Sequence, residues 1–280
     1  MGPLDDVARW PVPSAAVGVV GPGPTGGAGV VESTGDRDRP YPWASVTKPV
    51  TALAVLVAVE EGTLDLDEPA GPPGSTVRHL LAHASGLGPE GRRPLTAPGT
   101  RRIYSNAGFE WLAEVLADRS GMAFPAYLSD GVLGPLALSG TVLPDGASPA
   151  SGLHGPLDDL LRLAGELLVP TLISASTHRL ATSVAFPGLS GVLPGFGRFD
   201  PCDWGLGVEI RGTKDPHWTG GDNAPETFGH FGQSGSFVWV DPVARVACAG
   251  LADRPFGPWS AEVWPRLADA VLADRATSGS

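Results

Sequence analysis

The segment 45–61 restricts the possible folds more than any other part of this 280-residue chain. Its sequence, SVTKPVTALAVLVAVEE, has the length of a helix and is apolar on nearly every side, so it must be buried on most of its surface. Pro49 is tolerated because it lies in the first turn, where a backbone N–H group has no intrahelical acceptor. We therefore expect a buried helix that other elements surround, with Gly62 as its terminator.

Segments with strand character lie on both sides of this helix in the sequence. Residues 14–20 and 28–33 are short apolar runs, and the GPGPTGG between them is typical of a turn, so they predict a hairpin. Towards the other end of the chain, β-branched and aromatic residues predict strands at 204–212, 236–242 and 244–251.

The middle of the chain is predicted to be helical. Apolar residues recur at helical spacing in residues 75–86, 106–121 and 156–168. Ser75 and Asn106 are the expected N-caps of the first two helices.

The order of the predicted elements is strands, helices, strands and a final helix. That last helix, at 259–276, is amphipathic and is expected to kink or break at Pro265, and the Pro- and Gly-rich residues 186–202 are expected to form a loop. This order predicts an α/β (α+β) fold, with one antiparallel sheet built from both chain ends and flanked by helices, and a mostly helical region inserted between them. We expect a single domain, residues 1–280, with a sheet subdomain at about 1–65 and 200–280 and a helical subdomain at about 66–199.

Composition and charge limit the partners and the location. The net charge of −11 argues against nucleic acid and anionic membranes as partners. The chain does not open with a basic segment and an apolar run, and no stretch approaches about 18 apolar residues, so neither a secretory signal nor a transmembrane helix is expected. Cys202 and Cys248 are too few for a disulfide framework. We expect a cytoplasmic protein with Cys248 as a core thiol.

A first functional motif stands at the start of the central helix. Lys48 is one of two lysines among 19 basic residues, and it follows Ser45 by three positions. Side chains at i and i+3 of a helix are neighbours, with Cβ atoms about 5–6 Å apart. A lysine, unlike an arginine, can lose its proton when it is desolvated and then act as a base. We interpret the pair as a nucleophile with its proton acceptor; the alternative is a surface lysine near a helix start.

A second motif, Tyr104-Ser105-Asn106, directly precedes a predicted helix, where a loop can aim its side chains into a cleft. A tyrosine near a lysine can have a lowered pKa and share a proton with it. The asparagine amide can donate to an acyl carbonyl and orient the lysine. The alternatives are a core tyrosine and an asparagine that serves as an N-cap.

A third motif, His230-Phe231-Gly232-Gln233, lies just before the strand predicted at 236–242. Gly232 allows a substrate to lie close to the backbone, and the N–H group of Gln233 could join that of Ser45 as an oxyanion hole. A lone histidine is more commonly a satisfied polar residue than a catalytic one. The position of His230 makes it a candidate catalytic residue.

The three motifs, in this order, resemble the penicillin-recognising serine hydrolases, which include class C β-lactamases, D-alanyl-D-alanine carboxypeptidases and esterases on the same scaffold. The likeness covers most of residues 14–251, including STVRHLLAHASGL, YSNAGFEWLAEVLADRSG and WGLGVEI. It implies a β-lactamase/transpeptidase-like fold, a single catalytic domain and a covalent acyl-enzyme. By the same resemblance, Ser45 attacks a carbonyl, Lys48 with Tyr104 moves the proton, and the N–H groups of Ser45 and Gln233 hold the oxyanion.

The third motif departs from the β-lactamase pattern. In β-lactamases it usually reads Lys-Thr-Gly, and the cation and hydroxyl bind the substrate's carboxylate. His230 is mostly neutral at pH 7, and Phe231 has no hydroxyl. We therefore expect an esterase- or peptidase-like enzyme that acts on small-molecule esters or amides, with weak or no β-lactamase activity. The alternatives are a true β-lactamase or D-alanyl-D-alanine carboxypeptidase that takes a β-lactam or peptide, and a non-catalytic binding protein on the same scaffold.

Other site types lack their motifs in this sequence. No serine has glycines at both −2 and +2, as an α/β-hydrolase requires. His79 and His83 are four residues apart but lack the glutamate of a zinc protease, and His83 is expected to be a buried structural residue. We expect no metal and no cofactor. Tryptophans are expected either to wall an apolar pocket or to pack in the core; they include Trp43, Trp204 and Trp218.

Overall fold

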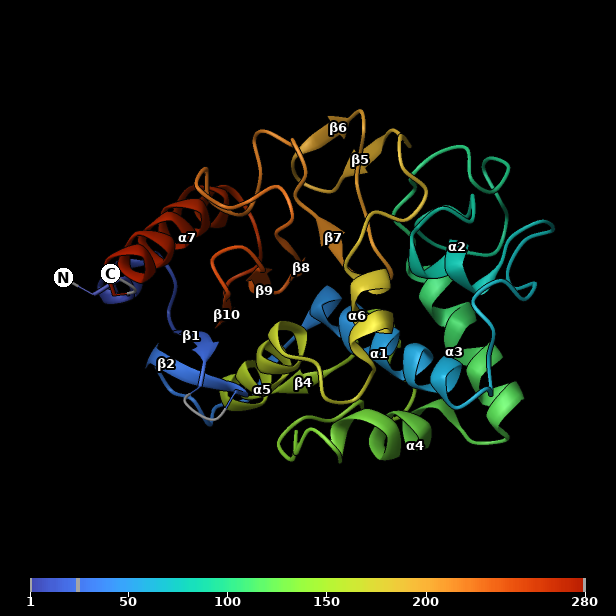
Figure 1. Cartoon of the computed structure of the whole chain (residues 1–280), viewed down its shortest axis with the longest axis horizontal. Coiled ribbons are helices and arrows are strands. Elements are labelled where there is room, and N and C mark those ends of the chain that lie inside the picture. Colours follow the sequence, from blue (N-terminus) through green and yellow to red (C-terminus); the bar gives the residue numbers. More distant parts are fainter. Residues whose placement is uncertain (1, 24–25, 279–280) are drawn as a thin grey trace.

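The computed structural model, which describes residues 2–23 and 26–278, is built around a six-stranded antiparallel sheet with strand order β2-β1-β10-β9-β8-β7 (Figure 1). Strand β1 pairs with β10, so the two ends of the chain lie side by side in the sheet, which confirms the predicted fold class. The strands are β1 Ala15–Pro22, β2 Ala28–Thr34, β7 Glu209–Ile210, β8 Phe228–Gly232, β9 Ser236–Asp241 and β10 Val246–Ala252.

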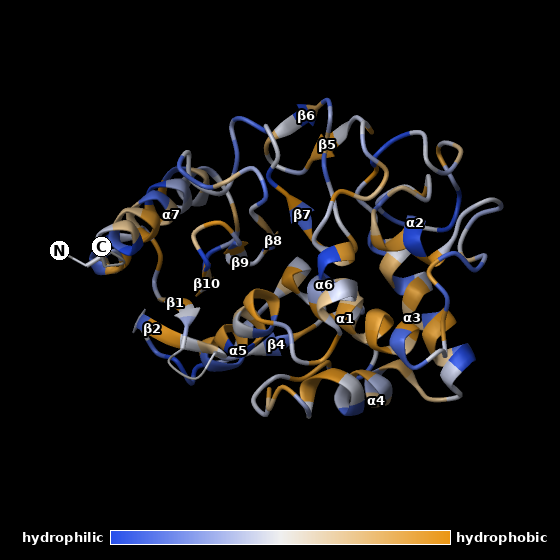
Figure 2. Ribbon diagram, in the orientation of Figure 1, coloured by the Kyte–Doolittle hydropathy of each residue, from blue (hydrophilic) through white to orange (hydrophobic). Residues whose placement is uncertain are grey.

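Helices cover both faces of this sheet. Successive side chains of a strand point to opposite faces of the sheet, so a strand that is apolar throughout must be shielded from water on both faces. In β10, Ala249 belongs to a cluster of buried apolar side chains that includes those of α5 (Leu157–Leu168). The neighbouring Cys248 belongs to a second cluster, which includes side chains of α7 (Pro258–Ser278). Burial raises the pKa of the Cys248 thiol, so the expected core thiol is confirmed. Hydrophobic and hydrophilic residues alternate along α7, which continues through Pro265 without a break (Figure 2).

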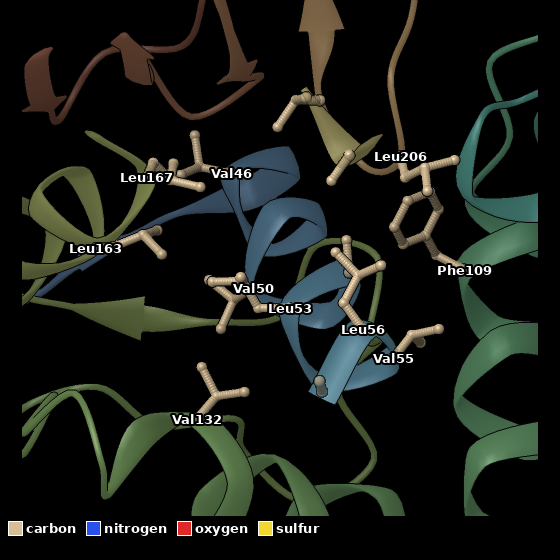
Figure 3. Packing of buried hydrophobic residues seen from close by; sticks show 14 of the residues in the cluster. Val46, Val50, Leu53, Val55, Leu56, Phe109, Val132, Leu163, Leu167 and Leu206 are labelled. Atoms are coloured by element: carbon tan, nitrogen blue, oxygen red, sulfur yellow. The ribbon is translucent and has the colours of Figure 1, made fainter. Parts of the chain in front are cut away.

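Helix α1 (Thr47–Glu60) lies where the sheet meets the remaining helices (Figure 1). Figure 3 shows its apolar side chains surrounded by Leu163 of α5, Phe109 of α3 (Asn106–Ser120) and Val132. The expected buried central helix is therefore confirmed. The other helices are α2 Val77–Leu81, α3 Asn106–Ser120, α4 Phe124–Leu128 and α6 Ala175–Ala181, with a π-helical turn Ser129–Leu133 and 3₁₀ turns Asp5–Arg9 and Ala44–Val46.

The helix expected at 75–86 is much shorter than predicted. It comprises only α2, because His83 has a φ of 55° and Gly86 a φ of 84°, and neither value occurs inside an α-helix. Its N-cap is Thr76 rather than Ser75, since the Thr76 hydroxyl accepts a hydrogen bond from the N–H of His79. His83 is fully buried, as predicted.

Other boundaries also differ from the prediction. The N-cap of α3 is Ser105 and not Asn106, because Ser105 Oγ accepts a hydrogen bond of 3.1 Å from the N–H of Gly108. The strand expected at 204–212 is reduced to β7, and β8, which contains His230, was not predicted.

Two short strand pairs complete the structure. Strand β3 (Tyr41–Pro42) pairs with β4 (His154–Gly155), and β5 (Gly191–Leu193) pairs with β6 (Gly197–Phe199) within the segment expected to be a loop.

Within residues 2–23 and 26–278, no helix combines the length and the apolar character that crossing a membrane requires. The cytoplasmic location stays a prediction. The division into a sheet and a helical subdomain also stays a prediction; α5, from the middle of the chain, packs against the sheet.

Candidate active site

Ser45 lies in the 3₁₀ turn Ala44–Val46, directly before α1. The chain ahead of it is fixed by Trp43, whose backbone N–H donates to the Leu153 carbonyl (2.8 Å) and whose indole N–H donates to the Gly155 carbonyl (3.1 Å). Ala44 has a φ of 44°, a left-handed conformation that a residue with a Cβ adopts only where its surroundings impose it. Tertiary contacts therefore hold Ser45 at the positive end of the α1 dipole.

Lys48 lies beneath Ser45 on the first turn of α1, and its side chain is fully buried. Its Nζ is 3.4 Å from Ser45 Oγ, 2.7 Å from Asn106 Oδ1 and 3.0 Å from the Ala150 carbonyl oxygen. A neutral amine has two N–H donors and one lone pair. Since Asn106 and Ala150 accept both donors, the lone pair is left for the hydroxyl proton of Ser45.

The protonation of Lys48 is set by two opposing effects. Burial lowers its pKa from the ordinary 10.5 to about 7, because the interior disfavours the ammonium form. The carboxylates of Glu90 and Glu110 act in the opposite direction and favour that form. The net result is an amine that is substantially uncharged at neutral pH.

Tyr104 reaches the same point from the segment that precedes α3. Its phenol hydrogen-bonds to Ser45, and Lys48 Nζ lies 4.6 Å from the centre of its ring. Burial raises the pKa of Tyr104 well above its usual 10, and the hydrogen bond to Ser45 offsets only part of this. The lowered pKa expected from the sequence is therefore wrong. Tyr104 remains a phenol at neutral pH, so it can relay a proton but is not the base.

Asn106 joins the site through both ends of its amide. Its carbonyl oxygen accepts from Lys48, and its Nδ2 donates to Glu90 Oε1 at 2.7 Å. One of the two N–H groups of Nδ2 is therefore engaged by Glu90, and donation by Asn106 to an acyl carbonyl stays a prediction.

His230 extends from β8 and is buried. Its Nδ1–H donates to the carbonyl of Phe231 at 2.7 Å, and among the described residues its Nε2 has no hydrogen-bond partner. Burial, together with the nearby Lys48, lowers the pKa of His230 to about 3. The ring is therefore neutral throughout the physiological pH range and supplies no cation.

Gly232 allows β8 to approach the turn that carries Ser45. A Cβ at this position would lie 2.5 Å from the Trp43 carbonyl oxygen and 2.3 Å from Ser236 Oγ, closer than real Cβ atoms come. Ser236 Oγ donates to the same carbonyl at 2.6 Å, and Ser234 Oγ donates to that of Pro42 at 2.7 Å. These contacts bring Gln233 to the cavity that Ser45 also lines.

The predicted residues meet at a cavity of about 210 Å³. Trp204 is one of its walls, whereas Trp43 and Trp218 are core residues outside its lining. Lys48 and Gly232 lie behind the lining and support it. The lining residues are Ser45, Tyr104, Asn106, Leu193, Pro194, Trp204, Glu209, His230, Phe231 and Gln233.

Glu209 and the second lysine were not recognised from the sequence. Glu209 lines the cavity, and its carboxylate is 2.7 Å from Lys214 Nζ and 2.9 Å from His217 Nε2, with a 3.0 Å hydrogen bond from Trp218. Burial alone would raise the pKa of Glu209, but His217 and Lys214 outweigh it and lower the value to about 2. Lys214 is thus paired internally and is not free to bind a substrate carboxylate.

Comparison with known proteins gives consistent results. A sequence model of the Beta-lactamase family matches residues 7–273. The crystal structure of a β-lactamase from Mycobacterium bovis is 52% identical in sequence, with a TM-score of 0.94 over 98% of this chain and 99% of that chain. EstCE1, described as a hydrolase with promiscuous acyltransferase activity, is 18% identical over 95% of each chain; its TM-score of 0.75 shows a shared fold alone.

Curated relatives match less of their length. A Salmonella enteritidis protein named "Putative D-alanyl-D-alanine carboxypeptidase" is 26% identical over 65% of this chain and 52% of its own. The chain therefore spans about half the length of the curated relatives that it matches. The family match covers nearly all of the chain, and the fold agrees with it. The chain belongs to the Beta-lactamase family.

Proposed function

We propose that this protein is a serine hydrolase that forms an acyl-enzyme at Ser45, with small uncharged esters or amides as its substrates. The observation that carries the proposal is the arrangement around Lys48. Its two N–H donors are occupied, its lone pair is left for Ser45 Oγ at 3.4 Å, and its pKa is about 7. A base with a pKa near the working pH is the most efficient proton acceptor.

The proposed reaction begins when Ser45 Oγ bonds to the substrate's carbonyl carbon and passes its proton to Lys48. The N–H groups of Ser45 and Gln233 hold the resulting oxyanion. The bond to the leaving group then breaks, and the leaving group takes up the proton that Lys48 returns through Tyr104. In the second half, water gives its proton to Lys48 and attacks the acyl carbon. The bond between the acyl carbon and Ser45 Oγ then breaks, Lys48 returns the proton to Ser45, and the acid is released.

The cavity chemistry supports uncharged substrates. In the described part of the chain, no lysine or arginine lines the cavity, His230 is neutral and Lys214 is paired with Glu209. A substrate carboxylate would lose its hydration without gaining a cation, which is unfavourable. The apolar walls formed by Leu193, Trp204 and Phe231, and the small volume, support a short acyl chain.

β-Lactamase activity is the second candidate, because a β-lactamase of known structure is 52% identical over nearly the whole chain. A panel of nitrocefin, a D-alanyl anilide and p-nitrophenyl acetate, butyrate and octanoate separates the candidates. We expect kcat/KM for p-nitrophenyl butyrate to exceed that for nitrocefin and for octanoate by about 100-fold or more, equivalent to about 2.7 kcal/mol. Nitrocefin turnover at or above the butyrate rate would establish the β-lactamase instead.

The pH dependence follows from the lowered pKa of Lys48. Only the neutral amine accepts a proton, so kcat/KM for a neutral ester should fall about tenfold for each pH unit below 7 and level off above it. The titration of His230 should not change kcat/KM between pH 5 and 9, because its pKa is about 3. Stopped-flow measurement between pH 5 and 9 checks the profile; a rate independent of pH across this range rules out Lys48 as the base.

Substituting His230→Lys should change the substrate preference. An ammonium at this position could pair with a substrate carboxylate, so the ratio of kcat/KM for a carboxylated ester to that for its neutral analogue should rise about tenfold. His230→Gln, which adds no charge, is the matched control. An unchanged ratio in a folded His230→Lys protein would mean that residue 230 does not face the substrate's acid group.

A further inference from the structure

We infer that Glu90 is a positioning residue that fixes the orientation of the Asn106 amide and thereby directs its carbonyl oxygen at Lys48. Glu90 lies on the loop between α2 and α3, and its Oε1 accepts the Asn106 Nδ2–H hydrogen bond at 2.7 Å. No motif in the sequence points to this residue. The inference rests on the proposed function for its effect on turnover, but its electrostatic part can be tested without any substrate.

The loop that carries Glu90 is fastened to the start of α3. The Pro89 carbonyl accepts the backbone N–H groups of Asn106 (2.9 Å) and Ala107 (3.3 Å). Ser105, the N-cap of α3, donates its hydroxyl hydrogen to the Gly88 carbonyl at 2.6 Å. These bonds hold the backbone next to Glu90 against the first turn of α3, within reach of the Asn106 side chain.

The Asn106 amide has one orientation that suits both of its neighbours. In this orientation, Oδ1 accepts from Lys48 at 2.7 Å and Nδ2 donates to Glu90 at 2.7 Å. In the reversed orientation, an N–H₂ group would face the Lys48 donors and the amide oxygen would face the carboxylate. Glu90 therefore excludes the reversed orientation, because two acceptor oxygens would then face each other. The reversed orientation would also leave one N–H donor of the buried Lys48 without an acceptor.

The negative charge of Glu90 also acts on Lys48. It favours the ammonium form and opposes the effect of burial, as does Glu110 of α3, which accepts a 3.0 Å hydrogen bond from Ser148. Tyr104, His83 and His230, which also face Lys48, are uncharged, because burial raises the pKa of the phenol and lowers the pKa of both imidazoles. Among the described residues, Glu90 and Glu110 are thus the acidic groups that raise the pKa of this amine.

Two substitutions separate orientation from charge. Glu90→Gln removes the charge but keeps an oxygen that accepts from Asn106, so the plateau kcat/KM should stay within about threefold of wild type while the acid limb moves to lower pH by about half a unit. Glu90→Ala removes both the charge and the acceptor oxygen. The plateau value of kcat/KM should therefore also fall about tenfold, corresponding to about 1.4 kcal/mol. Glu110→Gln is the control for charge alone and should move the limb without lowering the plateau.

The titration of Lys48 can be measured without substrate. Because the chain has two lysines, lysine labelled with ¹³C at Cε gives two signals, which Lys48→Met assigns. We expect the Lys48 midpoint to fall in Glu90→Gln and Glu110→Gln and to stay at the wild-type value in Glu114→Gln, whose partner is the surface residue Arg92. Equal plateau values of kcat/KM in Glu90→Ala and Glu90→Gln would overturn the inference. A Lys48 titration midpoint that moves in neither Glu90→Gln nor Glu110→Gln would also overturn it. An inactive wild type with the expected midpoints would refute the proposed function instead.

Discussion

Substitution of Ser45 by alanine is expected to lower kcat for p-nitrophenyl butyrate by roughly 10⁴-fold or more. The hydroxyl oxygen is the atom that bonds to the acyl carbon, so without it no acyl-enzyme can form. Ser45 also lies where Lys48 and Tyr104 converge, and the fully buried amine of Lys48 cannot take over as the nucleophile. Initial rates at saturating ester measure the effect directly.

The matched control for this substitution is Ser234→Ala. Ser234 also lies close to the site, and its hydroxyl donates to the Pro42 carbonyl at 2.7 Å, but it does not line the cavity. Its loss should lower kcat by no more than about tenfold, as expected for one hydrogen bond. If Ser45→Ala retained the rate of Ser234→Ala, Ser45 would not be the nucleophile.

Substitution of Lys48 by methionine should have the second largest effect, a loss of about 10²–10⁴ in kcat. Methionine is unbranched and of similar length, so it fills the buried site but accepts no proton. Asn106 Oδ1 and the Ala150 carbonyl lose their donor, so stability should also fall, and thermal unfolding must show that the variant is folded at the assay temperature. The loss should persist at high pH, where wild-type Lys48 is fully neutral.

Lys48→Arg distinguishes a base from a positive charge. The guanidinium stays protonated at any ordinary pH and cannot accept the Ser45 proton. We expect it to be as inactive as Lys48→Met. Activity of Lys48→Arg near the wild-type level would mean that residue 48 acts through its charge, and the proposed role of the neutral amine would be wrong.

The sheet and the central helix were predictable because they depend on local patterns. Uniform apolarity in residues 47–60 requires burial whatever the fold, and the strands at both chain ends are apolar enough to be covered on two faces. Strand β8 was missed because Gly229 and Gly232 weaken its strand signal. In the structure these glycines allow close approach: a Cβ at Gly229 would lie 2.1 Å from the Val238 carbonyl oxygen.

The candidate site was only partly predictable. Ser45, Lys48, Tyr104 and His230 could be proposed because unusual side chains stand in short motifs. The Ala150 carbonyl could not, because a backbone acceptor carries no side-chain signal. The direction of the Tyr104 pKa shift was wrong because the sequence shows a nearby amine but not the extent of burial, which dominates here.

The most direct test of the account is the mass of the intact protein after reaction with a fluorophosphonate probe at pH 8. The neutral amine of Lys48 should activate Ser45, so the wild type should gain the mass of one adduct, and peptide mapping should place it on Ser45. Ser45→Ala should gain none, and Lys48→Met should react at least about 100-fold more slowly. An unmodified wild type, or an equal adduct on Ser45→Ala, would contradict the central claim.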